Sequence, residues 1–119
     1  MVSITPDVGR NRLVIELVGL IGPEHFTLAE AQLKQALPRL KAPFDVLSDV
    51  RCLEGIHPDA MVYAQSLGQA IRRAGVRRVV RVVGKSANGA VHMERVARQL
   101  GHAARLAYSL EEADAVLGR

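Results

Sequence analysis

Apolar and polar positions along the chain follow two periods, one typical of strands and one typical of helices. Apolar runs at 2–5 and 12–21 flank the turn-rich segment "PDVGRN", which predicts an N-terminal β-hairpin. Three later runs rich in Val, Leu or Ala, at 43–53, 76–84 and 103–109, predict further strands.

Helical periodicity fills the remaining segments, which are 23–40, 58–75, 89–101 and 110–119. The first of them predicts one buried stripe of Phe26, Ala29, Leu33, Leu37 and Leu40. Pro38 lies inside that stripe, so we expect the helix to kink or end there. Gly75 is expected to cap the second helix at its C-terminus. Ser109 with Glu112 forms a capping box for the last helix.

Strands that alternate with helices after a hairpin predict an α/β fold with one mixed sheet. We expect about five strands and four helices, with 44–51 and 76–83 as neighbouring parallel strands. At 119 residues, of which 49% are hydrophobic, the chain has the size of a single domain over 1–119.

Charged residues recur at every second position in two predicted strands. Asp45, Asp49 and Arg51 share one face of the first, and Arg77 and Arg81 share one face of the second. If these faces coincide, Asp and Arg would pair across the strands. We interpret that face as partly open, or as covered by a partner chain.

The net charge of +4 raises the question of whether the protein binds nucleic acid, because six of the 16 basic residues fall within 72–85. Single-stranded nucleic-acid binders usually add stacking aromatic rings to such a groove, and this segment has none. We therefore predict no specific binding of nucleic acid. No apolar run reaches the length of a transmembrane segment, so we expect a cytoplasmic protein.

Metal, cofactor and nucleotide chemistry find little support in the sequence. Cys52 is the only cysteine, and the four histidines lack chelating spacing, so no metal site is predicted. Gly84-Lys85-Ser86 has the tail of a phosphate-binding loop, but Val79 occupies the place of its first glycine. No serine lies on a glycine-flanked elbow, so we predict no catalytic residues, no cofactor and no enzyme activity.

The junction between the strand at 43–53 and the following helix concentrates the candidate binding residues. They are Glu54, Gly55, His57, Pro58 and Asp59, followed on the expected exposed start of the helix by Val62, Tyr63 and Ser66. Open α/β sheets present binding groups at the carboxyl ends of their strands. Pro58 and Asp59 also suit the start of any helix, because Asp favours the positive end of the helix dipole.

Several stretches resemble the STAS domain, and more narrowly its SpoIIAA-like branch of anti-sigma-factor antagonists. They are "RLVIELVGLI", "FDVLSDVRCLEGIHPDA", "GVRRVVRVVG" and "VARQLG…ARLAYSLEEADAVL". The resemblance implies a STAS-like fold and a regulatory protein partner. Family members that act as phosphorylation switches carry Asp-Ser-Ser-Gly where this chain has His57-Pro58-Asp59-Ala60, while Asp49 matches the acidic residue at the end of the strand.

These observations favour a non-catalytic regulatory or interaction domain that binds a partner protein through the junction, without a phosphorylatable serine there. A lipid- or small-molecule-binding module is the alternative, since the branch also resembles the SEC14 fold, and it would need an apolar pocket above about 300 Å³. An enzyme using His57 with Glu54 or Asp59 would need a cleft and a nucleophile within reach. The sequence also leaves a homodimer open.

Overall fold

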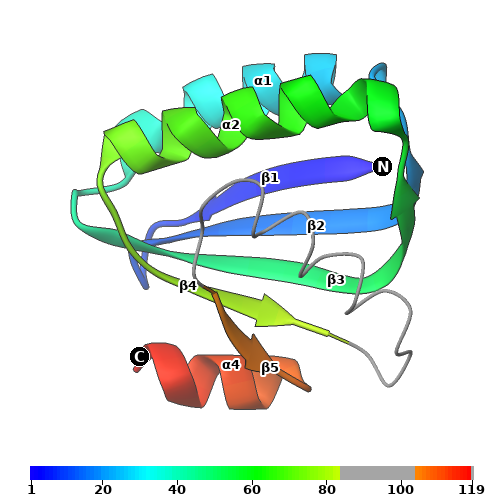
Figure 1. Ribbon diagram of the computed structural model, residues 1–119. Helices are drawn as coiled ribbons and strands as arrows, with labels where there is room; N and C mark the ends of the chain where they lie inside the picture. Colours follow the sequence, from blue (N-terminus) through cyan, green and yellow to red (C-terminus); the bar gives the residue numbers. More distant parts are fainter. Residues whose placement is uncertain (84–103, 119) are drawn as a thin grey trace.

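A computed structural model describes residues 1–83 and 104–118 (Figure 1). These residues form one five-stranded sheet in the order β1-β2-β3-β4-β5. Strands β1 (Val2–Asp7) and β2 (Arg12–Ile21) are the antiparallel hairpin. Strands β3 (Phe44–Ile56), β4 (Val76–Val82) and β5 (Arg105–Ala107) continue the sheet in parallel to β2. The predicted mixed sheet, its hairpin and the β3–β4 neighbourhood are confirmed.

The described helices are α1 (His25–Ala36), η1 (Leu37–Arg39), η2 (Pro58–Ala60), α2 (Met61–Ala74) and α4 (Leu110–Leu117), where η denotes a single 3₁₀ turn. Four helices were expected, and three α-helices lie in the described part of the chain. The predicted helix at 89–101 and the segment Gly84-Lys85-Ser86 lie outside the described residues. Among the helices at 1–83 and 104–118, none is long and apolar enough to cross a membrane.

Local sequence signals set the helix ends. Helix α1 tightens into the 3₁₀ turn η1 at Pro38, because proline has no N–H to donate and its ring clashes with the carbonyl of the preceding helical turn. Gly75 ends α2 in the left-handed conformation at φ 105°, which a side chain rarely adopts. The Ser109 hydroxyl accepts a hydrogen bond from the Glu112 N–H, and the Glu112 carboxylate accepts one from the Tyr108 N–H. The Ser109 cap is therefore confirmed, while Glu112 reaches back to the residue before the N-cap and not to the N-cap N–H of the predicted capping box.

Helices cover the two faces of the sheet unequally (Figure 1). Helices α1 and α2 lie over one face and bury its apolar residues, which include Leu13, Ile15, Val46, Val50 and Val83, against Phe26, Ala29, Leu33 and Ile71. Helix α4 packs on the other face, where Ala113 and Leu117 join a smaller cluster with Leu47, Val80 and Val82. The predicted stripe of α1 thus faces the larger core.

A β-bulge changes the expected pairing of charges between β3 and β4. Phe44 pairs with Val76 but Asp45 pairs with Arg78, so Arg77 is the extra residue. Both guanidiniums reach the Asp45 carboxylate, with Nη2···Oδ2 distances of 3.1 Å for Arg77 and 3.0 Å for Arg78. The prediction that Arg77 and Arg81 share a face was wrong, because the bulge shifts the side-chain alternation by one and turns Arg81 toward α1 and α2.

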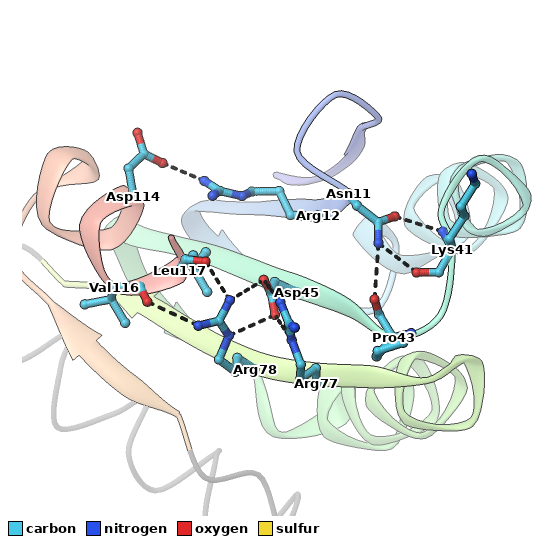
Figure 2. A network of polar contacts seen from close by, with 10 residues as sticks. All are labelled: Asn11, Arg12, Lys41, Pro43, Asp45, Arg77, Arg78, Asp114, Val116 and Leu117. Carbon is cyan, nitrogen blue, oxygen red and sulfur yellow. Dashed lines mark hydrogen bonds and ion pairs between the residues drawn. The ribbon is translucent and has the colours of Figure 1, made fainter. Parts of the chain in front are cut away.

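Polar contacts hold α4 against the sheet (Figure 2). Besides Asp45, Arg78 Nη2 donates to the Leu117 carbonyl at 2.6 Å, which satisfies a free acceptor at the end of the helix. Arg12 Nη1 lies 2.6 Å from Asp114 Oδ1, although Arg12 comes from β2 and is almost fully buried. Strands β2, β3 and β4 therefore all contribute to the attachment of α4.

The free edge of the sheet at β1 is partly closed by the chain itself. The Ile4 N–H points away from β2 and donates to Gln32 Oε1 of α1 at 2.9 Å. Pro6 has no N–H to offer at the same edge. An edge strand with occupied or missing donors is a poor template for a second strand.

Asp45 is expected to make the folding stability of the protein depend on pH. Burial alone would raise the pKa of Asp45, but the hydrogen bonds and charges of Arg78 and Arg77 outweigh it and hold that pKa below its ordinary value of 3.8. The unfolded chain then takes up this proton first as pH falls. Asp45 therefore stabilises the fold fully above about pH 4, and this contribution is lost as pH falls through the folded-state pKa.

Asp45→Asn should lower the free energy of unfolding by about 2 kcal/mol at neutral pH, because two charged hydrogen-bond donors lose their anion. The deficit should shrink on acidification, as urea denaturation at a series of pH values can measure. A deficit that stays constant below pH 4 would contradict the assignment.

Opening the β1 edge should make the protein associate with itself. The double variant Pro6→Thr and Gln32→Ala restores one edge donor and uncovers another, so light scattering after size exclusion should show larger species than for the parent protein. Gln35→Ala, on the same helix beside the same edge, is the matched control and should behave like the parent. Equal masses for all three proteins would show that the edge is not what limits association.

Candidate functional site

The strand β3 extends further than the sequence indicated. It runs to Ile56, so Glu54 and Gly55 belong to the strand and not to a loop. Strand β2 continues beside it, pairing Leu20 with Gly55 and Ile21 with Ile56. The His57 N–H then donates to the Ile21 carbonyl at 2.8 Å. Backbone pairing with a strand distant in sequence therefore overrides the local loop signal of Glu54-Gly55.

His57 caps the start of η2 with its imidazole. Its Nδ1 accepts a hydrogen bond from the Asp59 N–H at 3.1 Å, and Pro58 follows it as the first residue of η2. The Asp59 carboxylate lies 3.7 Å from His57 Nδ1, and its side chain is 79% exposed. Asp59 is thus near the positive helix end and directed to solvent, which leaves its carboxylate accessible to a partner.

The loop between β2 and α1 also holds a histidine that accepts a backbone hydrogen bond, but this histidine is the first residue of α1 and its donor lies before the helix. There the Gly22 N–H donates to His25 Nδ1 at 2.8 Å, and the Glu24 carboxylate lies 3.7 Å from the same nitrogen. Sequence reasoning passed over Gly22-Pro23-Glu24-His25, although it shares a proline followed by an acidic residue and a nearby histidine with His57-Pro58-Asp59. The similar residue composition of these two helix starts could have indicated that both loops belong to the site.

The two loops meet at the carboxyl ends of neighbouring parallel strands and enclose a hollow of about 260 Å³. Its lining consists of Leu20, Gly22, Pro23, Glu24, His57 and Asp59. Within this described lining there are two carboxylates and no cationic Lys or Arg side chain. The hollow is therefore locally acidic, although the chain as a whole carries +4.

Apolar side chains are exposed in the lining of this hollow and on the first turn of α2. Leu20 is 62% exposed, and on the first turn of α2 Val62 is 63% exposed. Tyr63 is also exposed, and its ring stacks on Phe26 of α1 with centroids 6.2 Å apart. Ser66, one turn further along α2, is exposed as well. The structure thus brings most of the predicted site residues to one end of the sheet and adds Leu20, which the sequence did not single out.

Asp49 is held by a neighbour on its own strand. Arg51 donates to both of its oxygens, from Nε at 2.9 Å and from Nη2 at 2.8 Å. Burial would raise the pKa of Asp49, but these hydrogen bonds and the Arg51 charge lower it overall, and the same pair raises the pKa of Arg51. Asp49 is therefore a structural anion of the outer sheet face.

The described part of the chain offers little support for a metal site or a pocket for a lipid-sized ligand. Among residues 1–83 and 104–118, no three His, Cys, Asp or Glu side chains come together as metal ligands. A second hollow of about 200 Å³ lies beside β1 and α1. Neither of these two hollows reaches the volume of about 300 Å³ expected of a lipid or drug-sized ligand.

Known structures share this architecture. A DUF3478-family protein from Shewanella loihica with a SpoIIAA-like fold superimposes with a TM-score of 0.74 at 18% identity, over 98% of this chain and 92% of the other. The chain has a SpoIIAA-like fold. The anti-sigma factor antagonist SpoIIAA in its unphosphorylated form also matches, with a TM-score of 0.64 at 15% identity over 100% of both chains. No protein-family model and no curated protein sequence matches the chain.

His57→Ala should destabilise the protein by about 1 kcal/mol, because the Asp59 N–H loses its acceptor at the helix start. His57→Asn is the matched control, since an Asn side chain can accept the same bond, and it should stay within a few tenths of a kcal/mol of the parent. Urea denaturation measures both. If the two variants lose equal stability, the imidazole acts through packing and not as a cap.

Proposed function

We propose that the chain is a non-catalytic regulatory domain over 1–119 that binds a partner protein through its junction surface. This surface consists of Glu54, Gly55, His57, Pro58, Asp59, Val62, Tyr63 and Ser66. The likeness to SpoIIAA supports a regulatory role at the level of the fold, since that protein is an anti-sigma factor antagonist.

Two exposed apolar residues carry the proposal, Leu20 in the lining of the hollow and Val62 on the first turn of α2. Val62 and Leu20 leave more than 60% of their surface open, on α2 and on the end of β2. Apolar anchors next to a concavity, with charged residues at the rim, are the usual layout of a binding hot spot. Here Glu54 and Asp59 supply the polar rim, and both are exposed.

The helix start is proposed to be a constant recognition feature and not a phosphorylation switch. His57-Pro58-Asp59-Ala60 contains no hydroxyl group to accept a phosphoryl group. Asp59 brings one negative charge to the place where a phosphoserine would bring about −1.5 to −2. Pro58 restricts its own φ and the conformation of His57, so the loop should present this charge rigidly.

Partner capture with matched surface variants tests the proposal. Val62→Asp should weaken the complex at least about tenfold, because it puts a charge into the centre of the contact. Val8→Asp is the control, since Val8 is also an exposed valine but lies on the turn between β1 and β2. A protein retained by the parent chain and by Val8→Asp, but lost with Val62→Asp, identifies the partner for calorimetric measurement of affinity.

Two results would contradict the proposal. Equal retention of every captured protein by Val62→Asp and Val8→Asp would place binding elsewhere on the molecule. Phosphorylation of Ser66 by a cognate kinase, with a change in partner affinity, would show that the site is switched by a residue other than those at the helix start.

A further inference from the structure

Three loops are joined at the amino ends of the parallel strands, opposite the junction surface. The Asn11 side chain bonds the Lys41 N–H, the Lys41 carbonyl and the Pro43 carbonyl (Figure 2). The Phe44 N–H donates to the Gly75 carbonyl, and a Cβ added at Gly75 would lie 2.8 Å from that of Ala42. The β1–β2 turn, the segment before β3 and the turn before β4 therefore form one fixed platform.

This platform concentrates exposed basic side chains, which we call the basic end: Arg10, Arg39, Lys41, Arg73 and Arg77. Two carboxylates of the described residues pair with members of this set. Asp7 is 3.7 Å from Arg10, and Asp45 is shared between Arg77 and Arg78. Within the described part of the chain, these two carboxylates cannot neutralise five exposed cations, so the basic end keeps a net positive charge.

The opposite end of the sheet has the reverse sign. Glu24, Glu54 and Asp59 are exposed at the carboxyl ends of β2 and β3. Glu111 and Glu112 add negative charge in the first turn of α4. Among the described residues, exposed cations thus gather at the amino ends of the strands and exposed carboxylates at the carboxyl ends. The basic end and the junction surface lie at opposite ends of β3, which has 13 residues.

We propose that the basic end is a second interaction surface that binds an acidic segment of a protein, rich in Asp and Glu. Guanidinium groups match carboxylates in bidentate geometry, and four of the five cations are arginines. Nucleic acid fits less well, because the platform segments 7–12, 37–43 and 72–77 contain no aromatic ring on which a base could stack. This surface is separate from the proposed function and would let the domain hold two partners at once.

A fluorescein-labelled poly-glutamate peptide serves as the probe, with fluorescence anisotropy as the measurement. Binding should be clear at about 10 mM ionic strength and much weaker at about 150 mM, where the screening length falls from about 30 Å to about 8 Å. Arg73→Glu and Lys41→Glu should each weaken binding about three- to tenfold. Arg105→Glu changes net charge equally but lies on the edge strand β5, and should change affinity less than about twofold.

Four results would overturn the inference. The first is that poly-glutamate does not bind at low salt. The second is that single-stranded DNA or phosphatidylglycerol vesicles bind more tightly than the peptide. A loss with Arg105→Glu equal to that with Arg73→Glu would show an effect of net charge alone. Peptide-free association of the protein that Arg73→Glu abolishes would identify a second copy, through its acidic end, as the occupant.

Val62→Asp separates this inference from the proposed function. It should leave poly-glutamate binding unchanged within about twofold, because Val62 lies at the far end of the sheet. If Val62→Asp fails to disturb partner capture while Arg73→Glu still weakens peptide binding, the junction proposal fails and the basic end stands. If Val62→Asp weakens peptide binding as much as Arg73→Glu, the basic end is not a separate surface.

Discussion

The Asp45 carboxylate connects the sheet to the helix on its outer face, and the attachment of that helix depends on it. Asp45 is 5% exposed, and it orders both Arg77 and Arg78 across the β3–β4 bulge. Arg78 in turn reaches the last carbonyls of α4. A buried carboxylate destabilises the fold unless it is paired. The bulge brings a second arginine to Asp45, so both guanidiniums compensate the buried charge. These polar contacts and the small apolar cluster beneath α4 together attach the helix to the sheet.

Parallel strands and their crossover helices also separate the charges of the molecule. Helices α1 and α2 begin at the carboxyl ends of β2 and β3, where Glu24 and Asp59 favour the positive ends of their dipoles. Both helices return to the amino ends of the strands, where Arg72 and Arg73 favour the negative end of α2. The same residues that stabilise the helix ends therefore give the domain one acidic and one basic end, which is the basis of both proposed surfaces.

The SpoIIAA-like fold is accompanied here by an unusual helix start. At η2 the His57 imidazole accepts the backbone donor that hydroxyl or carboxylate side chains commonly accept, and before α1 the His25 imidazole accepts the Gly22 N–H. This arrangement leaves Glu24 and Asp59 turned to solvent beside the hollow. Capping and charge are thus divided between two residue types, so the carboxylates are available for recognition while the loops keep their shape.

The sequence by itself determined the hairpin, the strand–helix alternation and the helix ends at Pro38, Gly75 and Ser109, because these depend on local periodicity and on residue geometry. Tertiary structure alone decided where β3 ends, since Leu20 and Ile21 pair with it from another strand. It also decided which arginines meet Asp45, because a bulge of one residue reverses the side-chain alternation. Contacts between residues distant in the chain leave no periodic trace in the sequence, and such contacts bring the loops of His25 and His57 together.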